Sequence, residues 1–266
     1  MRPELHFRAM GTTCSLFGDG DLSAGERWVR RIATRITRFD ESSELSRLNA
    51  AAAWVDISPE LEHLLRASLL AFEMSGGLVN VAVLPSMLAI GYTRPLTQGP
   101  TAAHLDQAHT APFLPEVLKV ARGRARLAPN VRIDLGGIAK GWLADRLAAE
   151  LGANCLVNLG GDLFARGDGP EGEGWPVGMG GATVLLRDQG AATSGTRRRA
   201  WRDGDERVHH LIDPRTGRPS ATDLREVSVV APTAAAAEVH AKAALLLGSR
   251  LAPAHLAASA LAWWLA

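Results

Sequence analysis

The 266-residue chain has few cysteines and no long apolar run. Cys14 and Cys155 are too few and too far apart to form a metal cluster or a disulfide framework, so we expect two small buried residues in strands. No stretch reaches the roughly 18 apolar residues of a membrane-spanning helix, and no membrane span is expected. The first residues show no apolar core and no cleavage site of an export signal. This predicts a cytoplasmic protein, or an exported one if an upstream segment has been removed.

A strong charge of either sign is also missing. Lys and Arg total 29 and Asp and Glu total 28, and a net charge of +1 argues against nucleic acid as the main partner. Lysine itself is scarce. The hydrophobic share of 47% and the charged share of 21% are typical of a globular protein. Because no stretch has the composition of a long linker, we expect residues 1–266 to form a single compact domain.

Hydrophobic spacing and capping residues predict the elements of the N-terminal half. Residues 5–17 alternate loosely and are predicted to form a first strand. Apolar residues at helical spacing predict an amphipathic helix over 24–39. Ser58 and Pro59 are typical of a helix start, and the helix that follows is expected to end at residues 76–77, a glycine pair.

The C-terminal half has a similar mixture of elements. A short apolar strand is predicted at 131–135, followed by a helix that contains Lys140. Further strands are expected near 155–159 and onward to Val230, and then an Ala- and Leu-rich helix over 233–247. Because strands and helices are segregated more than alternated, the pattern favours the α+β class over a doubly wound parallel sheet.

The most informative stretch is Asp134-Leu-Gly-Gly-Ile-Ala-Lys140-Gly141-Trp142-Leu-Ala-Asp145. It reads as a strand that runs through two glycines into a helix start. Free backbone amides at a helix start, together with a nearby ammonium group, form a site for an anion such as phosphate. Since Gly141 follows Lys140, the stretch is not a Walker A loop, which needs Ser or Thr there. The alternative is an ordinary turn with a solvated lysine.

Three other polar motifs follow predicted strands. They are Asn158-Leu-Gly-Gly-Asp162, Thr193-Ser194-Gly195 and His209-His210-Leu-Ile-Asp213-Pro-Arg-Thr-Gly217. Each of them taken alone can be a plain turn or a cap. Taken with the Lys140 stretch, these loops are dense in Asp, His, Lys, Ser and Thr, which favours loops that converge on one site.

The motifs together carry a family resemblance. Met10-Gly-Thr12, Ser43-Glu-Leu-Ser46-Arg-Leu-Asn49, the Lys140 stretch and the three later motifs occur in one order between about residues 7 and 248. In this respect the chain resembles the ApbE family, the FAD:protein FMN transferases. The resemblance implies an α+β fold with antiparallel sheets of the tunnelling-fold kind and packed helices. It also implies cleavage of FAD, attachment of FMN through a phosphoester bond to a Thr or Ser hydroxyl of an acceptor flavoprotein, and release of AMP.

The resemblance also implies roles for individual residues. His210 would handle the proton of the acceptor hydroxyl, because imidazole titrates near neutral pH, and Asp213 would orient its loop. A magnesium ion would be held by the Ala139 carbonyl and by Glu238. The positions expected to contact FAD are Met10, Leu78, Val79, Asn80, Asp134, Lys140, Gly141, Asp145, Asp162, Thr193, Ser194, Gly195, Ile212 and Lys242.

The chain departs from the family pattern at two places. Val79 and Asn80 stand where the family has a Phe-Asp segment. Glu238 and Lys242 stand where the family has the Asp and Thr that bind magnesium, and a protonated lysine cannot bind a metal. Lys242 is therefore expected either to replace the metal with an ammonium group or to form an ordinary pair with Glu238, one helical turn away. An alternative function remains open, that of an FAD-binding protein or FAD pyrophosphatase without transfer activity.

Overall fold

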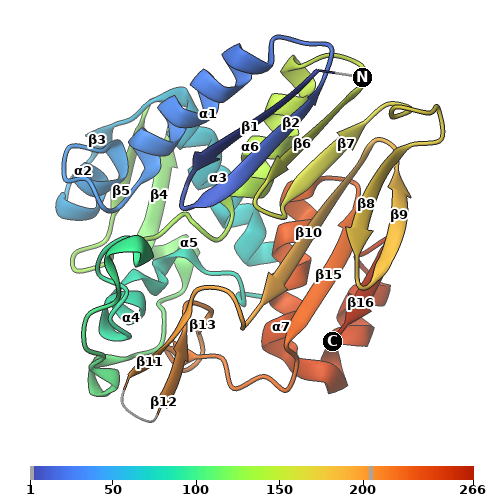
Figure 1. Ribbon diagram of the computed structural model, residues 1–266. Helices are drawn as coiled ribbons and strands as arrows, with labels where there is room; N and C mark the ends of the chain where they lie inside the picture. Colours follow the sequence, from blue (N-terminus) through green and yellow to red (C-terminus); the bar gives the residue numbers. More distant parts are fainter. Residues whose placement is uncertain (1–2, 204–205) are drawn as a thin grey trace. The chain divides into compact units, whose positions relative to one another are not determined.

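The structure, a computed structural model, describes residues 3–203 and 206–266 (Figure 1). The chain divides into two compact units. Unit 1 comprises Met1–Arg31, Ile138–Gly195 and Thr222–Ala266, and unit 2 comprises Ile32–Gly137 and Thr196–Ala221. The boundary near residue 31 falls inside helix α1 (Leu22–Ile36), close to the helix predicted over 24–39. The single domain expected over residues 1–266 stays a prediction.

Unit 1 is built on a seven-stranded sheet in which every neighbouring pair is antiparallel. Its order is β1-β2-β6-β7-β10-β15-β16. The prediction of one first strand over 5–17 is wrong, because the chain reverses at Met10 and Gly11 and forms a hairpin of two strands. The strands are β1 (Glu4–Ala9), β2 (Thr12–Gly18), β6 (Cys155–Leu159), β7 (Leu163–Arg166), β10 (Gln189–Gly195), β15 (Glu226–Ala231) and β16 (Ala262–Leu265).

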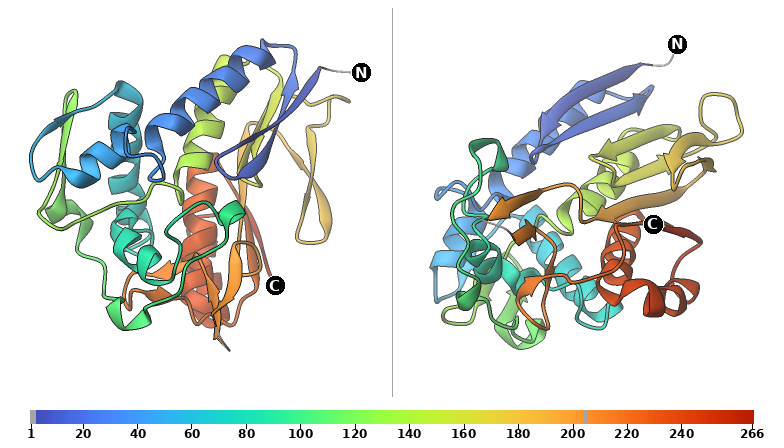
Figure 2. Two further views of the ribbon diagram at one scale, coloured as in Figure 1. Left: turned by 60° about the vertical axis from the view of Figure 1, so that its left-hand side comes forward. Right: turned by 60° about the horizontal axis from the view of Figure 1, so that its bottom comes forward.

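Helices α6 (Ala139–Glu150) and α7 (Ala234–Ala257) pack on the sheet of unit 1 and on each other (Figures 1 and 2). The Sγ atom of Cys155 lies 3.5 Å from the carbonyl oxygen of Ala148 in α6. Since neighbouring side chains of a strand point to opposite faces, Leu156 must face away from the helices. Helix α7 was predicted to end near residue 247; its helical geometry does break at Gly248, where φ is 74°, but the helix resumes and continues to Ala257.

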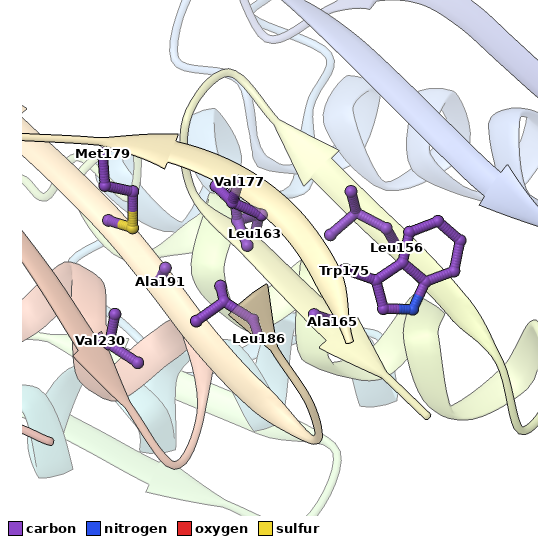
Figure 3. Packing of buried hydrophobic residues seen from close by; sticks show 9 residues of the cluster. All are labelled: Leu156, Leu163, Ala165, Trp175, Val177, Met179, Leu186, Ala191 and Val230. Atoms are coloured by element: carbon purple, nitrogen blue, oxygen red, sulfur yellow. The ribbon is translucent and has the colours of Figure 1, made fainter. Parts of the chain in front are cut away.

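The second face of this sheet is covered by a hairpin of β8 (Trp175–Met179) and β9 (Ala182–Leu186). Figure 3 shows Trp175, Val177 and Met179 of the hairpin packed against side chains of the sheet. The sheet contributes Leu156, Leu163, Ala165, Ala191 and Val230 to this core. The part of the sheet that this hairpin covers is therefore buried on both faces. Cys14 and Cys155 are fully buried strand residues, as predicted, and burial raises the pKa of the Cys155 thiol to about 11.

The strand register gathers several loops at one end of this sheet. Thr12 is paired with Ala9 across the first turn, and Cys14 is paired with Leu159, which precedes the turn between β6 and β7. Strand β10 runs antiparallel to β7 and ends at the same side with Gly195. The motifs at Met10, Asn158 and Thr193 therefore lie at one end of this sheet.

Unit 2 has shorter elements and three small sheets, of order β3-β5-β4, β11-β12 and β13-β14. Its own apolar cluster includes Leu84, Met87, Ile90, Val208 and Ile212. The helices are α2 (Glu44–Ala50), α3 (Pro59–Met74), α4 (Leu84–Ala89) and α5 (Leu114–Val117). The strands are β3 (Val55–Asp56), β4 (Leu118–Ala121), β5 (Arg124–Leu127), β11 (Ala200–Asp203), β12 (Glu206–His209), β13 (Ile212–Asp213) and β14 (Arg218–Pro219).

Two local predictions in unit 2 have different outcomes. Helix α3 is confirmed, with Ser58 accepting a hydrogen bond from the N–H of Leu61. The strand predicted at 131–135 is wrong. The backbone N–H and carbonyl of Ile133 pair with the side-chain amide of Asn49, at 2.8 and 2.9 Å. An amide side chain therefore provides the hydrogen bonds that a neighbouring strand would otherwise make with the backbone of this segment.

Helices and antiparallel sheets are mixed in the chain, so the predicted α+β class is confirmed. Within residues 3–203 and 206–266, no helix combines the length and the apolar character needed to cross a bilayer.

Candidate functional site

The clearest polar cluster of unit 1 surrounds the ammonium group of Lys140, in the first turn of α6. Its Nζ atom donates a hydrogen bond to Oδ2 of Asp162 and another, of 2.7 Å, to Oε1 of Glu238. Asp162 stands in the turn between β6 and β7, and Glu238 stands in α7. Their side chains are only 5% and 3% exposed, and that of Lys140 is 13% exposed. Three distant parts of the sequence thus form one buried ion cluster.

Glu238 also fixes the start of α6. Its second oxygen, Oε2, accepts a hydrogen bond of 2.9 Å from the backbone N–H of Gly141. A Cβ atom at Gly141 would lie 2.6 Å from the carbonyl oxygen of Ala234 in α7. The glycine is therefore required by the close approach of the two helices, and this approach lets the short Glu238 side chain reach α6.

Asp145 makes the reciprocal contact from α6 to α7. Its two carboxylate oxygens accept hydrogen bonds of 2.7 and 3.0 Å from the N–H groups of Ala234 and Ala235. These groups belong to the first turn of α7 and have no partner inside the helix. Burial raises the pKa of Asp145 to about 6, although the two hydrogen bonds act to lower it. Each helix therefore supplies a carboxylate that satisfies the N-terminus of the other.

The pKa values of the two carboxylates bound to Lys140 are shifted in opposite directions. Burial, followed by the negative charge of Glu238, raises the pKa of Asp162 to about 6. Burial also acts to raise the pKa of Glu238, but the ammonium groups of Lys140 and Lys242 and the N–H of Gly141 outweigh it and hold this pKa below its usual value. Asp162 is therefore the carboxylate of this pair that takes up a proton first.

Lys242 belongs to the same cluster. It follows Glu238 by one turn of α7, so the two side chains share a helix face. Its positive charge lowers the pKa of both Glu238 and Asp162. The four side chains Lys140, Lys242, Asp162 and Glu238 carry two positive and two negative charges, so the cluster is neutral as it stands.

The turns beside this cluster have unusual backbone geometry. Met10 has a φ of 51°, which costs a non-glycine residue about 1–2 kcal/mol. Gly160 has a φ of 80°, and a Cβ atom there would lie 2.3 Å from Oγ1 of Thr12. The tips of the two hairpins are therefore in direct contact, which places Met10 at the same end of the sheet as Asp162.

Thr193, Ser194 and Gly195 form the end of β10, as their motif predicts. Thr193 Oγ1 lies 2.9 Å from the hydroxyl oxygen of Ser228 on β15. Ser228 is buried and was not identified from the sequence, because a single serine inside an apolar strand gives no signal.

In unit 2, Asp134 pairs with an arginine that sequence reasoning also missed. Its Oδ2 atom accepts a 2.7 Å hydrogen bond from Arg38, whose side chain is 4% exposed. Arg38 donates to the carbonyl oxygen of Tyr92 and lies over the rings of Phe39 and Tyr92, at 4.2 and 4.6 Å from their centroids. Since 96 residues separate Arg38 and Asp134, no local spacing could have indicated this pair.

The segment Leu78-Val79-Asn80 is largely internal to unit 2. Val79 and Asn80 are buried. Oδ1 of Asn80 accepts from the N–H of Ala82, and Nδ2 donates to the carbonyl oxygen of Pro112, both at 2.9 Å. The amide side chain therefore holds two segments of unit 2 together. Whether this segment contacts FAD stays a prediction.

The motif with two histidines also lies in unit 2. His209 is buried, and its Nε2 atom lies 3.1 Å from the carbonyl oxygen of Ser220. His210 follows the end of β12 and is less buried. Asp213, next to the buried Ile212, accepts hydrogen bonds from the backbone N–H and the guanidinium group of Arg215. These contacts hold the turn that follows His210, and the catalytic roles of His210 and Asp213 stay predictions.

A magnesium ion does not fit the residues predicted to hold it. The carboxylates of Glu238 and Asp162 both bind the ammonium group of Lys140, which would lie against a cation held by either of them. In the part of the chain that the structure describes, no group of three or more His, Cys, Asp or Glu residues is arranged to hold a metal ion. The positive charge of this site comes from two lysines.

Comparison with known proteins agrees with the motifs. The sequence model of the ApbE family matches residues 10–263. A curated FAD:protein FMN transferase from Haemophilus influenzae is 27% identical over 275 residues, which cover 91% of this chain and 79% of that protein. A protein of the same name from Treponema pallidum is 32% identical over 245 residues, 78% of this chain and 66% of that protein.

A solved structure gives the same result for the fold. The crystal structure of an ApbE protein from Thermotoga maritima matches with a TM-score of 0.85 and 23% identity, and the match covers 100% of this chain and 94% of that one. The match with the family model spans nearly the whole chain, so the resemblance inferred from the ordered motifs is confirmed. This chain belongs to the ApbE family.

Proposed function

We propose that the chain is an FAD:protein FMN transferase. In this reaction a hydroxyl oxygen of an acceptor protein attacks the phosphorus atom that carries the FMN half of FAD. The bond to the AMP half breaks, AMP leaves, and FMN stays attached through a phosphoester. Family membership supports this function, since the two curated relatives described above carry this name. The chain spans 66% of the length of the second relative.

The observation that carries the proposal is the position of Lys140. It places an ammonium group at the start of α6, where the helix dipole also favours an anion and where the carboxylates of Asp162 and Glu238 already bind. Phosphoryl transfer needs such a fixed positive charge, because negative charge is spread over the phosphate oxygens in the transition state. The diphosphate of FAD is the anion that we assign to this position.

Other residues of unit 1 complete the proposed nucleotide site. Met10 would pack on the flavin ring from its hairpin tip, because a thioether adapts to a flat aromatic surface. Thr193, Ser194 and Gly195 would offer polar groups from the end of β10. Asp162 and Asp145 act through Lys140 and α7, so they shape the site more than they touch the nucleotide.

In unit 2 we assign Asp134, Leu78, Val79, Asn80 and Ile212 to the flavin nucleotide. His210 is the proposed base for the acceptor hydroxyl, and Asp213 holds its loop. The acceptor side chain is proposed to be Thr or Ser, because only a hydroxyl gives the phosphoester product. The cytoplasmic location stays a prediction from the sequence.

Product analysis tests the function directly. The protein is mixed with FAD, with and without threonine-containing peptides, and AMP, FMN and peptide-bound flavin are quantified by chromatography and mass spectrometry. We expect AMP to be released together with an equal amount of peptide-bound FMN, and peptides with Ala in place of Thr to remain unmodified. Release of free FMN and AMP without a peptide adduct would indicate the alternative, an FAD pyrophosphatase. Absence of FAD binding in calorimetry would refute both functions.

A further inference from the structure

The ion cluster of unit 1 contains two of the three lysines in the chain, Lys140 and Lys242; the third is Lys119. Lys140 donates hydrogen bonds to both buried carboxylates, Asp162 and Glu238, and Lys242 follows Glu238 by one turn of α7. Buried carboxylates need a nearby positive charge, because burial removes the water that would otherwise stabilise them. In this cluster the protein itself supplies both positive charges.

A divalent cation would have to break this arrangement. Magnesium needs an almost octahedral shell of oxygen atoms at short distance. The two oxygens of Glu238 already accept hydrogen bonds from Lys140 and from the N–H of Gly141, so a cation bound to this carboxylate would lie beside the ammonium group of Lys140. The carbonyl of Ala139, the first residue of α6, is the normal acceptor for the N–H group four residues later. The ion would also meet two ammonium groups in a poorly solvated place, where like charges repel strongly.

We infer that Lys140 and Lys242 take the place of a divalent cation, so that this chain binds the diphosphate of its nucleotide without metal. The inference rests on the proposed function for the identity of the nucleotide. An ammonium group on a side chain cannot be removed by a chelator, but it is a point charge and does not bridge two phosphate oxygens with metal geometry. Nucleotide binding should therefore be insensitive to EDTA and magnesium, and sensitive to loss of either lysine.

The first experiment uses the wild-type protein. Mn²⁺ binding to the protein alone is followed by electron paramagnetic resonance, and FAD binding is followed by calorimetry in EDTA and in millimolar Mg²⁺. We expect no stoichiometric Mn²⁺ site and FAD affinities that agree within about twofold. A stoichiometric Mn²⁺ site, or FAD binding at least tenfold tighter in Mg²⁺, would overturn the inference. If FAD does not bind at all, the proposed function fails, whereas the Mn²⁺ measurement still tests the metal site.

The second experiment changes the lysine. Lys242→Met keeps the length of the side chain and should weaken FAD binding in EDTA by roughly tenfold or more, the order expected when a charged contact is lost. Lys242→Thr combined with Glu238→Asp removes the ammonium group and shortens the carboxylate, and it should create a Mn²⁺ site and magnesium-dependent FAD binding. Unchanged FAD affinity in Lys242→Met would overturn the inference.

Lys119→Thr is the matched control. Lys119 is exposed, and its Nζ atom donates only to the carbonyl oxygen of Pro115 among the bonds described, so this variant should bind FAD and Mn²⁺ like the wild type. A folded double variant with no gain in Mn²⁺ binding would show that the ammonium group is not what excludes the metal. If the double variant does not fold, Lys242→Met and the wild-type measurements decide.

Discussion

Lys140→Met should lower the free energy of unfolding of unit 1 by several times the loss expected from a typical surface substitution. The change removes the ammonium group that both Asp162 and Glu238 contact, and it leaves two carboxylates that are 5% and 3% exposed without their main partner. Breaking a buried ion pair by removing one partner costs about 3–5 kcal/mol. For a domain of this size, each kcal/mol lowers Tm by about 2–4 °C, so Tm should fall by about 6–20 °C.

The loss should depend on pH in a defined direction. Burial has already raised the pKa of Asp162 from 3.8 to about 6, and removal of Lys140 raises it further. A carboxyl group whose folded pKa is raised contributes stability below its unfolded pKa, and this stability is lost as the pH rises through the folded pKa. The deficit of Lys140→Met relative to wild type should therefore be larger at pH 8 than at pH 5.

Differential scanning calorimetry over this pH range measures both effects. Lys119→Met is the control and should stay within about 0.5 kcal/mol of wild type, as expected for an exposed side chain. Combining Lys140→Met with Glu238→Gln should cost less than the two single losses added together, because each single variant gives the cluster a net charge and the double variant is neutral. An unchanged Tm, or a deficit that grows as the pH falls, would refute the account of this cluster.

Three further predictions address other parts of the molecule. His210→Ala should lower the rate of transfer by roughly 10²–10⁴-fold with little effect on FAD affinity. His63→Ala, on the exposed side of α3, is the control and should change neither the rate nor the affinity. Equal losses of rate and affinity in His210→Ala would make His210 a binding residue. Asp145 has a pKa raised to about 6, so its stabilising contribution is complete below pH 3.8 and is lost as the pH passes 6. Urea unfolding should therefore show a flatter dependence of stability on pH between 4 and 6 for Asp145→Asn than for wild type; parallel curves would contradict this. Gly160→Ala should lower the free energy of unfolding by about 1–3 kcal/mol, because φ is 80° and the new Cβ would lie 2.3 Å from Thr12 in the adjacent hairpin. Gly123→Ala is the control, since its φ is 72° and the space around it is open, so it measures the backbone part of that cost. Equal losses of stability in the two variants would show that the contact with Thr12 is unimportant.

The sequence was most informative where the signal is local. Ser58 and Pro59 determine the start of α3 through a side-chain hydrogen bond and a fixed φ, and both effects act within one helical turn. The strand wrongly predicted at 131–135 has the right composition but no neighbouring strand, since the side chain of Asn49 supplies the hydrogen bonds. Composition indicates an extended apolar segment; it does not identify the partner.

The turn at Met10 was missed for a different reason. Two-residue hairpin turns with positive φ usually contain Asn or Gly, and methionine in the first position is a weak turn signal. Its left-handed conformation is imposed by the pairing of Ala9 with Thr12 and by the contact between Thr12 and Gly160. The contact with Gly160 is a tertiary effect, which a local pattern does not contain.

The candidate site shows the same division. The sequence indicated Lys140, Asp162 and Glu238 separately, because each belongs to a recognisable motif or helix position. It did not indicate that one carboxylate oxygen of Glu238 binds Lys140 while the other binds the N–H of Gly141. This contact depends on the packing of α6 against α7, which Gly141 permits and Asp145 reinforces.

The use of lysine in place of arginine is the strongest reason to think that this cluster serves to supply positive charge. The chain has 29 basic residues and only three lysines, so arginine is its usual cation. Arginine presents a planar group that binds carboxylates side by side, whereas lysine presents a compact charge that can turn toward several oxygens. Two of the three lysines belong to this cluster: Lys140 binds both buried carboxylates, and Lys242 follows Glu238 by one helical turn. A metal ion would also supply a compact positive charge there. The lysines therefore account for the departure of Glu238 and Lys242 from the metal-binding pattern of the family.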